Sequence, residues 1–109
     1  MLRLNVQKNW NNNLYCDYFG MFRLRDDEKH KEGQNYSICL MDGETEMFTK
    51  TFRLHLILNT SFETFTDAMA MTGLGMTKEK AKGTLYNMYK NKVEDIKKAN
   101  FSFLIFGKP

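Results

Sequence analysis

The four arginines of the chain are the residues whose type and spacing most directly suggest a chemical role. Apolar and polar residues alternate through much of the first half of the sequence, with the period of half-buried strands. In that register Arg3, Arg23, Arg25 and Arg53 all fall on the outward faces of the expected strands. Guanidinium groups are planar and permanently charged, so they suit phosphate contacts, base stacking or an anchoring role at an interface.

Two aromatic residues and a histidine belong to the same outward face. They occupy alternate positions of the expected strands, beside the arginines. We therefore predict a partner-binding face that consists of Arg3, Tyr15, Phe19, Arg23, Arg25, Arg53 and His55. The alternative is that these residues form the ordinary solvated face of a sheet that is buried only on its other side.

The residues that would support catalysis or metal binding form no recognisable pattern. Gly73-Leu74-Gly75 precedes an expected helix, but it follows another helix and lacks the third glycine of a dinucleotide-binding fingerprint. His30 lies in a charged loop and His55 on a strand, and neither has the spacing to Cys16 or Cys39 that a metal site needs. No nucleophile can be paired with a base. We therefore expect a protein that is not an enzyme and that has no catalytic residues, metal or cofactor.

Five strands are expected to position the outward-facing side chains. They cover residues 2–6, 14–25, 36–40, 46–58 and 101–106. Residues 26–34 are expected to form a charged hairpin loop, and Asp42-Gly43 is the strongest turn signal, a candidate type I′ turn. The last strand is apolar on both faces, as expected inside a sheet.

Two helices are expected on either side of a break at residues 72–77. Thr60 to Glu63 has the form of a capping box at the start of the first helix, and Gly73 is a natural stop. Thr77 can cap the second helix, which is expected to extend to about residue 98 with a break near residue 91. The elements together predict a single α+β domain over residues 1–109. In the order β-β-β-β-α-α-β, an antiparallel sheet of about five strands has two helices on one face and a partly exposed second face.

Helix, glycine turn and helix resemble the helix-turn-helix unit of DNA-binding proteins in the segment from Gly75 to Leu85. The sequence departs from that pattern at Gly83, which weakens the would-be recognition helix at a cost of about 1 kcal/mol relative to alanine. Gly83 also suggests a contact that needs the space. The resemblance implies that nucleic acid is contacted by Thr77, Lys78, Lys80 and Lys82.

No stretch of the sequence is as long and apolar as a membrane span, and the first residues lack the apolar region of a signal peptide. Two cysteines are too few to define a disulfide framework. Cys16 is expected to fill the core, and both thiols are expected to be reduced. These features predict a cytoplasmic protein, located in the host cytoplasm if a phage encodes it.

Charge is segregated along the chain. Residues 26–46 carry seven acidic residues and two lysines, whereas residues 76–98 carry seven lysines and three acidic residues. Such a bipolar distribution favours oriented docking onto a charged partner. Lysine and asparagine are abundant and the only proline is Pro109, a composition typical of AT-rich genomes and of many phage accessory genes.

Size, composition and charge lead to two hypotheses. The favoured one is a small non-enzymatic binding protein, a viral inhibitor of the anti-CRISPR or anti-restriction class. Such a protein would occupy a surface of a host nucleic-acid-processing complex through protein–protein interaction or nucleic-acid mimicry. The alternative is a helix-turn-helix transcriptional regulator that binds DNA through residues 77–85. Neither hypothesis specifies the oligomeric state.

Overall fold

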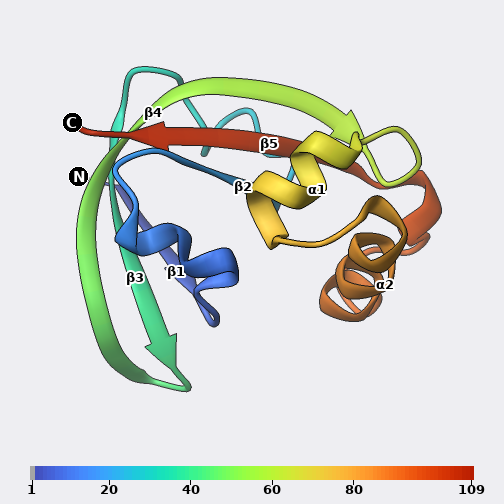
Figure 1. The fold of residues 1–109 in the computed structure, drawn as a ribbon, viewed down its shortest axis with the longest axis horizontal. Helices are drawn as coiled ribbons and strands as arrows, with labels where there is room; N and C mark the ends of the chain where they lie inside the picture. Colours follow the sequence, from blue (N-terminus) through green and yellow to red (C-terminus); the bar gives the residue numbers. More distant parts are fainter. Residues whose placement is uncertain (1) are drawn as a thin grey trace.

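The computed structural model describes residues 2–109, and its largest feature is a strongly curved five-stranded sheet (Figure 1). The elements, in chain order, are β1 (Leu2–Val6), η1 (Trp10–Tyr15), β2 (Phe19–Leu24), β3 (Asn35–Asp42), β4 (Thr45–Ser61), α1 (Asp67–Leu74), α2 (Lys78–Tyr89), η2 (Ile96–Lys98) and β5 (Asn100–Gly107). η1 and η2 are 3₁₀ helices. No helix among the described residues is long and apolar enough to cross a membrane.

The strand order in the sheet is β1-β3-β4-β5-β2. The expected α+β class, five strands and two helices are therefore confirmed. The sheet is mixed, because β1 pairs in parallel with β3 while the other three pairs are antiparallel. A parallel pair needs a long connection, and here η1 and β2 lie between the two strands in the chain. β5 lies between β4 and β2, as the apolar residues on both of its faces predicted.

The second face of the sheet is not partly exposed, as the sequence suggested, but encloses a core of its own. Phe19 of β2 contacts Phe52 of β4 with ring centroids 4.9 Å apart, although these strands are not neighbours in the sheet. The sheet therefore curls, aided by a register shift in β4 between Leu54 and Leu56. The buried residues of this inner core are Leu4, Leu14, Phe19, Tyr36, Ile38, Phe52, Leu54, Leu104 and Phe106.

The helices cover the opposite face, on the side of β2 and β5. Phe22 and Phe103 lie against each other at 5.0 Å between ring centroids, and α1 and α2 pack over them. Gly73 of α1 lies directly on this pair, so that a Cβ there would be 2.9 Å from the Phe103 ring. The buried residues of this outer core are Phe22, Phe62, Phe65, Ala70, Leu74, Ala81, Leu85, Tyr89, Ile96, Ala99, Phe101 and Phe103.

The segment before β2 differs from the predicted strand. Residues 10–15 form η1, with Asn11 and Asn12 at positive φ, and β2 begins only at Phe19. Phe19 was predicted on the outward face, but its side chain is 5% exposed, because both faces of β2 are covered. Cys16 was predicted in the core and is exposed, while Cys39 is buried; both are free thiols.

The charged segment 26–34 is not a hairpin loop. β2 lies at one edge of the sheet, whereas β3 is second from the other edge, so the loop crosses between them. Its end is bound to β4: the Gly33 amide donates to the Leu54 carbonyl at 2.7 Å, and the Glu32 carboxylate accepts from the Ile57 amide at 2.9 Å. β2 pairs with the apolar β5 instead of with β3, its neighbour along the chain.

Helix boundaries and one turn also differ from the predictions. Ser61 still belongs to β4, and Thr66 rather than Thr60 caps α1 by accepting from the Met69 amide. The first helix continues past Gly73 to Leu74, and Gly75, which has a φ of 71°, caps its end. The predicted Thr77 cap of α2 is confirmed, but α2 ends at Tyr89.

Two glycines also differ from what was expected of them. A Cβ at Gly83 would meet no atom within 4 Å, so no tight contact requires that glycine. At the β3–β4 turn only Gly43 has a positive φ, of 61°, which fits type II′ rather than type I′.

Candidate functional site: a pocket between the edges of the sheet

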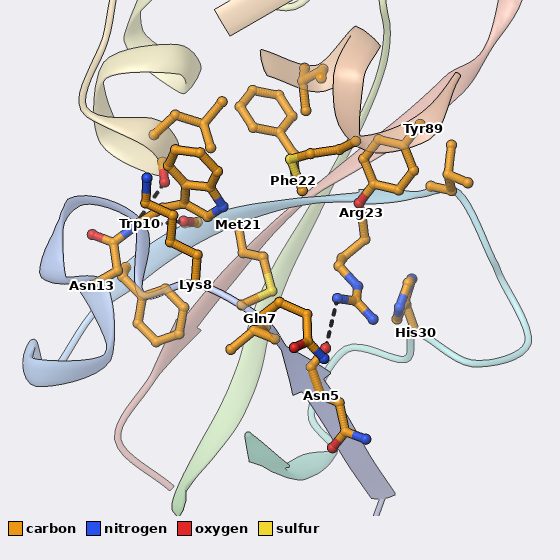
Figure 2. Close-up of a pocket in the computed structure, with 18 of the residues that line it drawn as sticks. Asn5, Gln7, Lys8, Trp10, Asn13, Met21, Phe22, Arg23, His30 and Tyr89 are labelled. Atoms are coloured by element: carbon orange, nitrogen blue, oxygen red, sulfur yellow. Dashed lines mark hydrogen bonds between the residues drawn. The ribbon is translucent and has the colours of Figure 1, made fainter. Parts of the chain in front are cut away.

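The curled sheet brings its two edge strands, β1 and β2, face to face. One hydrogen bond joins them, from Arg23 Nη1 to the Asn5 carbonyl at 3.3 Å (Figure 2). Around this contact lies a pocket of about 650 Å³, which we call the seam pocket. It is lined by residues 5–10, 13–14, 19–26, 29–30, 73–74, 85, 88–89 and 92. Its volume is within the range of small-molecule sites.

η1 forms one wall of the seam pocket, and Asn13 fixes it in place. The Asn13 amide nitrogen lies 3.2 Å from the Gly20 carbonyl, 3.2 Å from the Thr72 carbonyl and 3.1 Å from the Gly73 carbonyl. One side chain therefore links η1, β2 and the end of α1, where backbone carbonyls lack helical partners. Side chains of the asparagine-rich segment thus help to build this wall.

The apolar part of the pocket comes from both cores. Met21 reaches it from β2, Trp10 from η1, and Leu85 and Tyr89 from α2. Trp10 is half-buried, with the Lys8 ammonium 4.1 Å from its ring centroid. Aromatic and apolar walls of this kind suit the flat or hydrocarbon part of a ligand.

The pocket also holds polar groups without partners. Among the described residues, the buried side-chain atoms that lack any hydrogen-bond partner are Asn9 Nδ2, His30 Nδ1 and His30 Nε2. Both residues line the seam pocket, and His30 is 5% exposed. Such atoms normally cost about 1–3 kcal/mol each when buried unpaired, so they are uncommon in folded proteins. Both residues that carry these partnerless atoms therefore lie at the same pocket.

Arg23 differs from the other three arginines in what it contacts. Arg3 pairs with Glu46 at 3.4 Å, Arg25 with Asp27 at 3.0 Å, and Arg53 Nε donates to the Asn35 side chain at 3.2 Å. Within the described residues, the guanidinium of Arg23 makes a single hydrogen bond, to the backbone of Asn5. A guanidinium has five N–H donors, so most of those on Arg23 are available to a ligand.

The charge around the pocket is strongly positive. Its lining includes one carboxylate, Asp26, against five basic residues: Lys8, Arg23, Arg25, Lys29 and Lys92. Burial, with Arg23 nearby, lowers the pKa of His30, so its neutral form is favoured at pH 7. Burial raises the pKa of Tyr89, which lies above Arg23 in Figure 2.

The partner-binding face predicted from the sequence is dispersed in the structure. The buried Phe19, Arg23 and Arg25 line the seam pocket, whereas Tyr15 is exposed on η1 and packs edge-on against Phe48. His55 lies beside Tyr18, with its Nε2 3.1 Å from the Lys108 carbonyl. The arginines other than Arg23 are held by the partners given above, so the seven residues do not form one surface.

The lysines of the helix-turn-helix alternative are partly occupied. Lys78 Nζ donates to the Glu63 carbonyl at 2.9 Å, and Lys82 forms an ion pair with the Glu63 carboxylate at 3.1 Å. Lys80 is exposed, and the Thr77 hydroxyl caps α2. Two of the four residues expected to contact nucleic acid therefore contact the turn before α1.

The acidic segment 26–46 is also divided. Its first acidic residues lie in the loop before β3, and its last lie in the turn after β3, so the length of that strand separates them (Figure 1). Among the described residues no group of three or more His, Cys, Asp or Glu side chains is arranged to hold a metal ion.

Sequence reasoning assigned Arg23 to a binding site but missed its true neighbours. His30 was placed in a charged loop, and Asn9, Trp10 and Tyr89 were assigned to no binding site. These residues meet only because the sheet curls and α2 packs over β2, so no spacing along the chain signals the pocket. Comparisons of the chain with protein-family models, with curated proteins and with solved structures found no match.

Proposed function

We propose that the protein is a non-enzymatic binding protein and that the seam pocket is its recognition site. The observation that supports this most directly is that Asn9 and His30, whose buried side-chain nitrogens have no hydrogen-bond partner, line the same pocket. Keeping them costs stability, and a ligand that pairs with them would recover it. The excess of basic residues around the pocket would attract that ligand.

The inhibitor hypothesis from the sequence is a narrower form of this proposal. In that form the protein acts on a nucleic-acid-processing complex, and the seam pocket contributes to recognition there. Support comes from composition and from the exposed lysines of residues 90–98. The DNA-binding alternative has less support, because Lys78 and Lys82 contact Glu63.

The test separates a binding role of His30 from a structural one. In His30→Leu the two unpaired nitrogens are replaced by an apolar side chain, so the free protein should become more stable by about 1 kcal/mol or more. The wild-type melting temperature should rise when the small-molecule fraction of a cell extract is added, and His30→Leu should lose that rise. His55→Leu, which changes the other histidine of the chain outside the pocket, is the matched control.

Trp10 provides a second measurement, since it is the only tryptophan and lines the pocket. Its fluorescence should change with the same fraction in the wild type and in the control. A wild type that responds in neither measurement, together with a less stable His30→Leu, would show that His30 is structural and would remove the proposal.

A further inference from the structure

The arrangement of Arg23 and His30 specifies the chemistry of the ligand, and this inference rests on the proposed function. Figure 2 shows the His30 ring beside the guanidinium of Arg23, with Asn5 below and Tyr89 above. The guanidinium has donors to spare, and both ring nitrogens of His30 are buried and unpaired. A planar fork of N–H donors beside an imidazole is suited to an anion with several oxygen acceptors.

The opposite part of the pocket has a different character. Trp10 and Met21 give it an apolar wall, and Asn9, next to Trp10 in the chain, has an unpaired amide donor there. The side-chain oxygen of Asn9, Oδ1, accepts from the Leu14 backbone amide at 2.9 Å, which fixes Nδ2 as the unpaired atom. A ligand that extends from Arg23 to Trp10 would therefore need an apolar middle, and an acceptor at its far end would pair with Asn9.

We propose that the seam pocket binds a small organic oxyanion, a carboxylate or a phosphate monoester, with its charged group between Arg23 and His30 and its apolar body against Met21, Trp10 and Tyr89. The five basic residues of the lining stabilise the charge. Arg25 is already paired with Asp27, so Arg23 carries the direct contact.

Binding of the anion is coupled to protonation of His30. The charged groups that act on this imidazole are Arg23 on β2 and Asp26, Asp27 and Lys29 in its own loop. Lys92 and the Tyr89 hydroxyl line the same pocket from the side of α2. In the free protein burial and Arg23 favour the neutral ring, whereas an adjacent anion favours the imidazolium. A carboxylate ligand, which stays ionised over this range, should therefore bind more tightly as the pH falls from 8 to 6.

The experiment uses benzoate and phenyl phosphate as probes, with benzamide as the neutral analogue and inorganic phosphate as the anion without an apolar body. NMR titrations follow the imidazole C–H signals of His30 and the indole N–H signal of Trp10. Both aromatic anions should shift both signals and raise the pKa of His30, benzamide should not, and inorganic phosphate should shift His30 alone. The ratio of the two aromatic anions' affinities distinguishes a carboxylate site from a phosphate site.

Matched variants locate the site. Arg23→Gln should weaken binding of the preferred anion by about tenfold or more, since a charge-assisted hydrogen bond is lost. Arg53→Gln, an exposed arginine outside the pocket, should leave the affinity unchanged. Unfolding midpoints of both variants show whether the fold is kept, and the pH dependence of binding in the wild type gives an independent readout.

Two results would overturn the inference in different ways. If benzamide binds as tightly as benzoate, with no effect of Arg23→Gln, the pocket binds ligands without recognising charge, and the proposed function survives. If no probe shifts His30 or Trp10 at about 10 mM, where even weak millimolar sites are filled, the pocket does not bind oxyanions. The proposed function is then judged by the cell-extract experiment alone.

Discussion

Two glycines of this protein illustrate how much the surroundings of a residue decide its role. Gly20 lies in β2, where a Cβ would overlap the ring of Phe103, so the absence of a side chain lets β2 lie close under that ring. Gly83 lies within α2, where a Cβ would meet open space. The same residue type is therefore required at one position and only tolerated at the other.

Replacement of each glycine by alanine should change stability in opposite directions. Gly20→Ala overpacks the outer core and should lower the free energy of unfolding by about 1–3 kcal/mol. Gly83→Ala reduces the conformational freedom of the unfolded chain at a helical position. It should therefore raise the free energy of unfolding by up to about 1 kcal/mol. Denaturant unfolding of both variants measures the difference. Equal effects of the two substitutions would mean that the Phe103 ring does not lie close enough to Gly20 to exclude a Cβ.

Among the elements, η1 is held to the rest of the molecule by both hydrogen bonds and apolar contacts. The Asn13 amide lies near carbonyls of β2 and α1, and the Asn11 amide lies 3.4 Å from the Met71 carbonyl. Leu14 is buried in the inner core, and Trp10 packs against the outer core.

Asn13→Ala should loosen η1 while the two cores remain. The buried carbonyls of Gly20 and Gly73 lose the Asn13 donor, which should cost about 1–3 kcal/mol. Amide exchange should become faster in residues 10–15 and at the end of α1, with β4 and β5 less affected. Asn12→Gly is the control: Asn12 is exposed at a φ of 55°, a conformation that glycine adopts freely, and its change should stay below about 0.5 kcal/mol.

For the molecule as a whole, the buried histidine makes stability depend on pH in a defined window. The folded-state pKa of His30 is lowered below the value of about 6.5 that a histidine has in an unfolded chain. Between these two pKa values the unfolded chain binds more protons, so folding stability is full above about pH 6.5 and falls as the pH decreases towards the folded-state pKa.

Thermal unfolding from pH 8 to 5 should show this decrease in the wild type. His30→Leu should lack that part of the decrease, and His55→Leu should retain it. Asp27 and Glu46, whose pKa values are lowered by Arg25 and by hydrogen bonds from Thr49 and Cys39 respectively, contribute only at more acidic pH. A decrease of the same size in both histidine variants would assign the effect to other groups. Binding of an oxyanion should reduce the decrease, because it raises the pKa of His30 in the folded state.

Some local features of this protein could be predicted from its sequence alone. The Thr77 cap, the turn at Gly43 and the apolar pattern of β5 each depend on neighbouring residues, so their positions follow from the chain. The sequence of strands and helices follows for the same reason, as does the α+β class. Boundaries such as the end of β4 at Ser61 were missed, since strand pairing with β5 extends it beyond the local pattern.

Only the tertiary structure decided which faces are buried and where a ligand would bind. Alternation identifies residues that share a face of a strand, but it does not say whether that face meets solvent. In β2 both faces are covered, one by the inner core and one by the helices, so Phe19 is buried and Arg23 lies in a pocket. The contacts between Asn5 and Arg23, and the placing of His30 near Tyr89, join parts of the chain that are distant in sequence. These contacts arise from the curl of the sheet, in which all five strands pack around the inner core.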